Sequence, residues 1–87
     1  MDLVKHEVRA RGAIVDLSPT EFRLLETLLR NAGRVLTRQS LLARVWGYED
    51  EPEANAVDLY IHYLRRKIGD AATITTVRGV GYRLEAD

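Results

Sequence analysis

The chain has 87 residues, with 13 basic and 13 acidic side chains, two histidines and no cysteine. This length suits a single domain over residues 1–87, and the lack of cysteine excludes disulfide bonds and thiolate metal sites. The net charge of zero argues against a general polyanion binder, and no apolar run approaches the roughly 20 residues of a membrane span. Because the first residues also lack the apolar core of a signal peptide, we expect a soluble, cytoplasmic domain.

The first predicted elements are a β-hairpin and a helix. Residues 6–17 form short alternating runs around Arg11-Gly12, a pattern typical of a hairpin. A helix begins at Pro19, because Ser18 is a suitable N-cap and Glu21 completes a capping box. Apolar residues at spacings of three and four predict its buried stripe, which consists of Phe22, Leu25, Leu28, Leu29 and Ala32.

A second, short helix is predicted after a tight corner. Thr37 is its N-cap and Gly47 ends it. Only residues 32–36 separate the first two helices, a connection that suits a helix-turn-helix. Trp46, next to the end of the helix, is either a core residue at the corner or a donor to a phosphate through its ring nitrogen.

The third predicted helix spans about residues 53–68 and is amphipathic. Its apolar stripe consists of Val57, Ile61, Leu64 and Ile68. The other side carries Asn55, Asp58, Leu59, His62, Tyr63 and Arg66, with Arg65 and Lys67 on the two flanks.

This polar side is either a solvated surface or a surface that reads DNA. Base edges in the major groove are read by side chains that donate and accept hydrogen bonds, and flanking cations suit phosphates. The side chains that can donate or accept such hydrogen bonds are Asn55, His62, Tyr63 and Arg66. Leu59 is apolar on a side that should be wet, which either a thymine methyl or a neighbouring part of the fold would explain.

The last predicted element is a hairpin over about residues 74–85. Its two β-rich runs surround Gly79 and Gly81, which permit positive φ and a tight reversal. The hairpin is either an ordinary sheet edge kept soluble by arginine or a wing beside the third helix. As a wing, it would bring Arg78 at its tip to a narrow minor groove, where negative potential is concentrated.

Charge is unevenly distributed along the second half of the chain. Residues 47–58 carry five acidic side chains and no basic one, whereas residues 59–83 carry five basic and one acidic. The acidic segment is either a solvated loop or a contact for another protein. Catalysis has little support, because His6 and His62 fall in no metal-ligand spacing and in no recognisable nucleophile-base pair. We therefore expect neither an enzyme nor a bound metal or cofactor.

Three segments, in this order and spacing, resemble one known family. They are "LSPTEFRLLETLLRNAGRVLTRQSLLARVWG" (17–47), "VDLYIHYLRRKIG" (57–69) and "TVRGVGYRL" (76–84). The chain is similar, over about residues 2–85, to the winged-helix effector domain of two-component response regulators of the OmpR/PhoB type. The resemblance implies an α+β winged helix-turn-helix with N-terminal antiparallel strands, three helices and a C-terminal β-hairpin wing.

The resemblance, taken with the helix pattern, also implies the site residues. Base reading in the major groove falls to Asn55, Asp58, His62, Tyr63 and Arg66. Contacts to the DNA backbone or the minor groove fall to Thr37, Trp46, Arg65, Lys67, Thr76, Arg78 and Tyr82. A contact with RNA polymerase falls to Glu49, Asp50 and Glu51 in the loop before the third helix.

Members of this family carry a phosphorylatable receiver domain before the effector domain. A sensor histidine kinase acts on that receiver in a phosphorelay, and two copies bind tandem DNA half-sites as a homodimer formed through the receiver. We therefore expect this chain to be a fragment that lacks the receiver and part of the first sheet, with double-stranded DNA and RNA polymerase as partners.

The resemblance does not extend to base preference. Family members often have arginine where this chain has Asn55, His62 or Tyr63, so the sequence preference is not carried over. Two alternatives stay open for the domain. One is a winged helix of a one-component or membrane-anchored activator, and the other is a protein-interaction winged helix that uses the acidic loop and Leu59.

Overall fold

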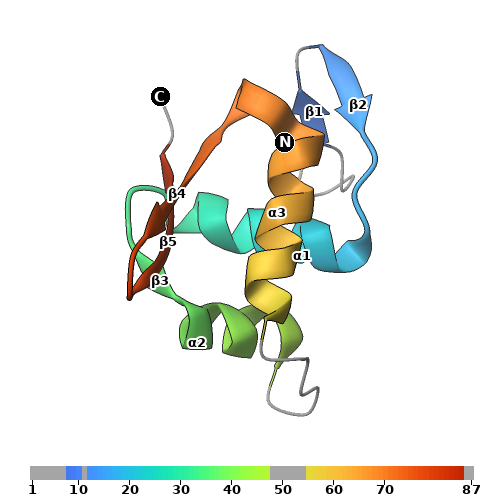
Figure 1. Cartoon of the computed structure of the whole chain (residues 1–87). Coiled ribbons are helices and arrows are strands. Elements are labelled where there is room, and N and C mark those ends of the chain that lie inside the picture. The colour runs from blue at the N-terminus through green and yellow to red at the C-terminus, as the bar shows by residue number, and fades with distance from the viewer. Residues whose placement is uncertain (1–7, 11, 48–54, 86–87) are drawn as a thin grey trace.

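The computed structural model describes residues 8–10, 12–47 and 55–85 of the chain. The elements in chain order are β1 (Val8–Ala10), β2 (Ala13–Val15), α1 (Pro19–Arg30), β3 (Leu36–Thr37), α2 (Arg38–Leu41), the π-helical turn η1 (Leu42–Trp46), α3 (Ala56–Ile68), the 3₁₀ turn η2 (Gly69–Ala71), β4 (Thr73–Val77) and β5 (Gly81–Glu85). Figure 1 shows α1 crossing behind α3, with the β1–β2 hairpin near one end of α3 and α2 near the other.

The N-terminal hairpin is confirmed, with strands shorter than the predicted range. Val8 lies opposite Val15 and Ala10 lies opposite Ala13, so the chain turns between Ala10 and Ala13. Gly12 in this turn has a φ of 79°, in the left-handed region that glycine adopts without strain. Residues 6 and 7 of the predicted hairpin lie outside the described ranges.

The start of α1 follows from a complete capping box. The Ser18 hydroxyl accepts a hydrogen bond from the Glu21 amide at 3.2 Å, and the Glu21 carboxylate accepts one from the Ser18 amide at 2.8 Å. Pro19 occupies the first helical position, where an amide hydrogen would have no partner within the helix. The predicted first residue of the helix is therefore correct.

The end of α1 differs from the prediction. The helix stops at Arg30, so Ala32, which was expected in the buried stripe, is exposed beyond its end. Asn31 caps the helix and its Nδ2 donates to the Thr27 carbonyl at 2.8 Å, and beyond it the Gly33 amide donates to the Leu84 carbonyl of β5 at 2.9 Å. Leu24, which the predicted stripe omitted, is fully buried instead. The buried face of α1 is therefore wider and shorter than the spacing alone indicated.

The second helix begins as predicted and then changes its winding. Thr37 caps α2 by accepting a hydrogen bond from the Ser40 amide at 3.0 Å. Beyond α2 the chain forms η1, whose last bond runs from the Gly47 amide to the Leu42 carbonyl, five residues back, at 3.0 Å. The predicted single α-helix is thus one α-turn followed by one π-turn that ends at Trp46.

The strand β3 was not predicted, and it explains Gly81. β3 pairs antiparallel with β5, with Leu36 opposite Tyr82 and Thr37 opposite Gly81. A Cβ atom on Gly81 would lie 2.0 Å from the Leu36 carbonyl oxygen, so only glycine permits this approach. Of the two glycines that permit a positive φ here, only Gly79 adopts one, with φ 72°.

The third helix has the predicted buried stripe and a later start. The helix begins at Ala56, after a turn at Asn55, rather than at about residue 53. The predicted first turn at Pro52 and Glu53 lies outside the described residues. The stripe is confirmed, because each of its members is buried, and these are Val57, Ile61, Leu64 and Ile68.

One hydrophobic core holds these elements together. It joins α1, the α2–η1 segment, the inner stripe of α3 and the last two strands. The second sheet has the order β3-β5-β4, so the C-terminal hairpin gains a third strand that leads directly into α2. Among the residues that the structure describes, no helix has the length and apolar character that a bilayer crossing requires. The fold is the predicted α+β winged helix-turn-helix, with α2 and α3 as its helices and β4–β5 as its wing.

Candidate nucleic-acid interface

The face of α3 opposite its buried stripe is open. Asn55, just before the helix, and Leu59, His62, Tyr63 and Arg66 within it are all exposed. Their spacing of three and four residues places them on one side of the helix. Arg66 has no hydrogen bond or ion pair within the described part of the chain, so its guanidinium is available to a ligand.

Asp58 turns from this open face toward the wing. Its Oδ1 accepts hydrogen bonds from Arg38 Nε, at 2.9 Å, and from the Tyr82 hydroxyl. The Arg38 guanidinium carbon also lies 5.7 Å from the centre of the Tyr82 ring. One carboxylate therefore ties α2, α3 and β5 together. Asp58 was expected to read bases and Tyr82 to contact the backbone, but the structure gives both of them partners inside the protein.

The protonation states of Asp58, Tyr82 and Arg38, which form one hydrogen-bonded cluster, support one another. Hydrogen bonds from Tyr82 and then from Arg38 lower the pKa of Asp58, although burial opposes them. Burial raises the pKa of Tyr82, and the hydrogen bond to Asp58 raises it further. The bond to Asp58 likewise raises the pKa of Arg38. At neutral pH the cluster therefore holds an ionised Asp58, a neutral Tyr82 and a cationic Arg38.

Arg65 fastens the wing to α3 on the same flank. Its Nε and Nη2 donate to the Ile74 carbonyl at 3.1 and 2.6 Å, and Nη2 also donates to the Thr76 hydroxyl at 2.9 Å. Its guanidinium carbon lies 5.7 Å from the centre of the Tyr82 ring, as that of Arg38 does. Arg65 therefore sets the position of β4 relative to the helix, whatever else it contacts.

The tip of the wing carries exposed basic and apolar side chains. Arg78 lies in the turn between β4 and β5 and is exposed, as is its neighbour Val80. Because Thr37 pairs with Gly81 at the start of β5, this turn lies next to the beginning of α2. Figure 1 shows the turn at the same end of the molecule as α2 and the start of α3. The tip, Arg38 and α3 therefore border a single surface.

Trp46 joins the end of η1 to α3 through aromatic contacts. Its ring centre lies 5.3 Å from that of Tyr60 in an edge-to-face arrangement, and Tyr60 meets Tyr63 in the same manner at 5.7 Å. Trp46 also packs against the core, so both interpretations of it stay compatible with its position. Thr37 is exposed, and its hydroxyl can still donate a hydrogen bond while it caps α2.

Lys67 lies on the opposite flank and is held by α1. Its Nζ donates to Glu21 Oε1 at 2.7 Å, and the Glu21 side chain is only 4% exposed. Burial raises the pKa of Glu21, but hydrogen bonds from Lys67 and Ser18 outweigh it, so the pKa is lowered overall. An open hollow of about 460 Å³ lies here, lined by Glu21, Tyr63, Arg66 and Lys67.

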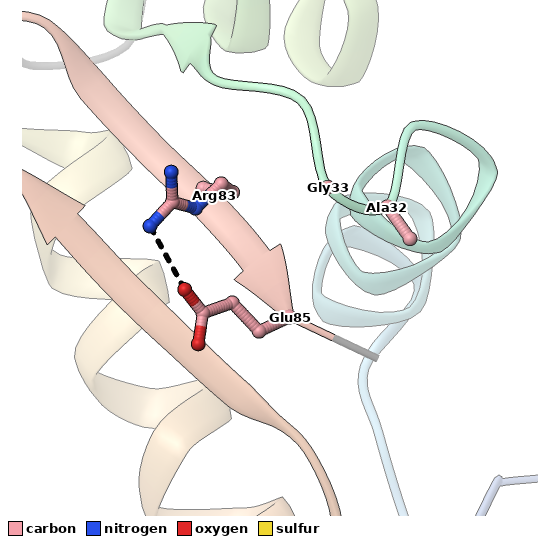
Figure 2. Close-up of a pocket in the computed structure, with 4 residues that line it drawn as sticks. All are labelled: Ala32, Gly33, Arg83 and Glu85. Carbon is pink, nitrogen blue, oxygen red and sulfur yellow. Dashed lines mark hydrogen bonds and ion pairs between the residues drawn. The ribbon is translucent and has the colours of Figure 1, made fainter. Parts of the chain in front are cut away.

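A second hollow, of about 370 Å³, lies at the far end of β5 from the wing tip. It is lined by Ala32, Gly33, Arg83 and Glu85 (Figure 2). The Arg83 guanidinium donates to the Glu85 carboxylate at 2.8 Å, and both side chains are partly exposed. The two charges offset each other, so this hollow lacks the net positive charge that attracts a phosphate.

Arg38 is the residue that the sequence reasoning missed. In the sequence it is simply the residue after a helix cap. A cation in the first turn of a helix opposes the helix dipole, and this local conflict is the signal that could have singled it out. The predicted polymerase contacts Glu49, Asp50 and Glu51 lie outside the described residues.

The arrangement defines a class of protein, a winged helix-turn-helix domain with an open recognition face and basic side chains around it. Residues 12–84 match the family model described as "Transcriptional regulatory protein, C terminal". The chain belongs to this family, which comprises the DNA-binding effector domains of response regulators of the OmpR/PhoB type and not enzymes.

Curated relatives are response regulators. The chain is 41% identical over 85 residues to the response regulator protein PmrA of Pseudomonas aeruginosa, an alignment that covers 98% of this chain and 38% of PmrA. It is 47% identical over 85 residues to the response regulator ArlR of Staphylococcus haemolyticus, covering 94% of this chain and 39% of ArlR. The chain thus spans less than half the length of these relatives.

Solved structures show the same fold. The DNA-binding domain of Bacillus subtilis CssR is 31% identical with a TM-score of 0.86, covering 95% of this chain and 94% of that one. The DNA-binding domain of Klebsiella pneumoniae RstA, in complex with the RstA box, is 34% identical with a TM-score of 0.85, covering 97% of this chain and 87% of that one.

Proposed function

We propose that this chain is the effector part of a two-component response regulator and binds specific duplex DNA sequences with α3 in the major groove. One observation carries the proposal. The apolar stripe of α3 is buried, and the opposite face is open between Arg38 and the wing on one flank and Lys67 on the other. An α-helix fits the major groove, and side chains on an open face reach the base edges there.

Base reading falls to four side chains of this open face, Asn55, His62, Tyr63 and Arg66. An amide pairs with adenine and a guanidinium with guanine through two hydrogen bonds each, whereas imidazole and phenol groups donate or accept one. Asp58 is reassigned from base reading to positioning, because its Oδ1 already accepts two internal hydrogen bonds.

Phosphate contacts fall to groups around that face. Arg38 uses only Nε for Asp58, so its two terminal nitrogens are available to one phosphate in the bidentate geometry that arginine favours. The other proposed backbone contacts are Thr37, Trp46, Arg65, Lys67 and Thr76, with Arg78 at the minor groove. Tyr82 is buried and acts through Arg38 and Asp58 instead.

The remaining partners follow from the relatives, which are response regulators of more than twice this length. We propose that a receiver domain precedes this chain in the whole protein, that a sensor histidine kinase acts on it, and that it pairs two copies on tandem half-sites. RNA polymerase is proposed to contact the acidic loop at Glu49, Asp50 and Glu51. The proposed location is the cytoplasm.

The test is selection of bound sequences from a random duplex pool, at low salt because a single domain with few phosphate contacts binds weakly at physiological salt. We expect one enriched motif of about half a helical turn, repeated in tandem in the tightest clones. His62→Ala and Tyr63→Ala should change the enriched bases. Ile14→Ala, an exposed apolar substitution on β2, should leave them unchanged. Failure to retain any duplex at low salt would overturn the proposal.

A further inference from the structure

Leu59 is an apolar side chain at the centre of the open face of α3. It is 41% exposed and does not pack against the hydrophobic core. Of the two explanations that the sequence left open, cover by a neighbouring part of the fold is therefore incomplete within the described residues, because 41% of the surface of Leu59 stays open. Tyr63, the other large exposed apolar residue on α3, carries a hydroxyl, so Leu59 is the aliphatic one.

The neighbours of Leu59 place it where the helix would meet the bases. Asn55 lies four residues before it, and His62, Tyr63 and Arg66 lie three, four and seven residues after it, all on the same side of the helix. Any approach that brings these four polar side chains to base edges therefore brings Leu59 between them, against the floor of the groove.

The groups on the floor of the major groove then determine which base can pack favourably against Leu59. The major-groove edges of guanine, cytosine and adenine present hydrogen-bond donors and acceptors and carry no methyl group. An isobutyl group that covered such atoms would remove their water and offer no hydrogen bond in return, which is costly. The C5-methyl group of a pyrimidine is the only methyl group on this surface.

We propose that Leu59 is a specificity-determining residue that recognises the C5-methyl group of a pyrimidine, thymine or 5-methylcytosine, between the bases read by its polar neighbours. The inference rests on the proposed function and adds a contact that needs no hydrogen bond. The competing explanation is that an exposed leucine is simply a good helix former without a ligand, since isolated apolar residues are common on protein surfaces.

The test removes single methyl groups from a DNA duplex that the chain itself has selected. Each thymine is replaced in turn by uracil, which differs only at C5, and binding is measured by fluorescence anisotropy at fixed salt. We expect affinity to fall roughly fourfold at one or two adjacent positions, the loss that corresponds to exposing one buried methyl group. At the same position, 5-methylcytosine should bind more tightly than cytosine, which separates the methyl group from the rest of the base.

Variants assign the effect to the side chain. Leu59→Ala should bind thymine and uracil duplexes within about twofold of each other, and it should fold, because alanine is a better helix former than leucine. Ile14→Ala, which truncates an apolar side chain on β2 that is more exposed than Leu59, should keep the full preference.

Two kinds of failure are distinguishable. Equal binding of thymine and uracil duplexes at every position, a selected motif without thymine, or a thymine preference that survives Leu59→Ala would overturn the inference and leave the proposed function standing. No binding of any duplex at low salt would overturn both.

Discussion

At the scale of single residues, the position of the Arg38 guanidinium is fixed from two sides. Asp58 accepts its Nε hydrogen at 2.9 Å, and the Tyr82 ring lies beneath it. A side chain fixed in this way loses less conformational entropy when it binds a phosphate than a free arginine does. Arg38 is therefore expected to contribute more to DNA binding than its exposed position in the sequence pattern suggests.

Arg38→Ala should lower DNA affinity by about tenfold on all duplexes alike, because a phosphate contact carries no sequence information. The slope of log affinity against log salt should become shallower by about one. Binding titrations at several salt concentrations measure both quantities. Arg30→Ala, at the exposed end of α1, is the matched control and should change neither. An unchanged slope for Arg38→Ala would remove this residue from the interface.

Glu21 links the start of α1 to the third helix, and its ionisation should make stability depend on pH. Its pKa in the folded chain lies below the ordinary value of 4.5. The extra stability is therefore fully present above about pH 4.5 and is lost as the pH falls through the lowered pKa. Glu21→Gln should lower the free energy of unfolding at pH 7 by about 1 kcal/mol and flatten its decline in acid.

Urea denaturation followed by circular dichroism, at pH 7 and at several values below 4.5, measures this dependence. Glu26→Gln is the matched control, since its ion pair with Arg30 is long, at 3.8 Å, and close to the surface. Asp58 contributes in the same direction through its own lowered pKa, so some acid sensitivity should remain in Glu21→Gln. A variant as acid-sensitive as the parent chain would contradict the role given to Glu21.

At the scale of elements, the base of the wing packs into the core, whereas its tip extends away from the core. Its strand β5 is paired on both sides, with β3 and with β4, and Arg65 bonds β4 to α3. At the tip, by contrast, the turn residues 78–80, which include Arg78, extend beyond the last strand pair, Val77 with Gly81. The base of the wing is therefore positioned by packing, and its tip is left to make contacts.

Arg78→Ala should weaken binding most on duplexes whose flanks are rich in A·T pairs, because a narrow minor groove concentrates negative potential. Competition between duplexes that differ only in the flank measures the effect. Arg83→Ala offers a comparison on the same hairpin, since Arg83 pairs with Glu85 at the other end of β5. Equal losses on every flank would count against minor-groove recognition by the tip.

Gly81→Ala should destabilise the chain by about 2–4 kcal/mol, because the new Cβ would meet the Leu36 carbonyl oxygen at 2.0 Å. Gly79→Ala is the matched comparison in the same turn. It has a φ of 72° but no atom within 4 Å of the new Cβ, so only about 1 kcal/mol of backbone strain is expected. Thermal and urea unfolding rank the two variants, and equal costs would show that the approach of β3 is not the constraint.

At the scale of the whole molecule, one domain offers few phosphate contacts. With roughly four to six of them, log affinity should fall with log salt at a slope of about −4 to −5. Two chains joined by a flexible linker should bind tandem half-sites, about 10 to 11 base pairs apart, at least 100-fold more tightly than one chain does. Changing the spacing by half a helical turn should abolish the gain. A gain that is independent of spacing would contradict tandem binding.

Much of the fold was predictable because it is encoded locally. The capping box joins Ser18 to Glu21, three residues away, and the stripe of α3 depends only on helical periodicity. The family resemblance added the assignment of the last hairpin as a wing. The later start of α3 and the π-turn that ends at Trp46 were not predictable, since neither has a strong local signature.

The sequence by itself determined the order of the helices, the start of α1, which face of α3 is polar and which class of domain results. The tertiary structure decided which polar groups are already committed within the protein. Asp58 meets Arg38 and Tyr82, which lie 20 and 24 residues away, and Lys67 meets Glu21 across 46 residues. Periodicity assigns a side chain to one side of a helix, but its partner there is set by long-range packing, which brings distant segments within hydrogen-bond distance.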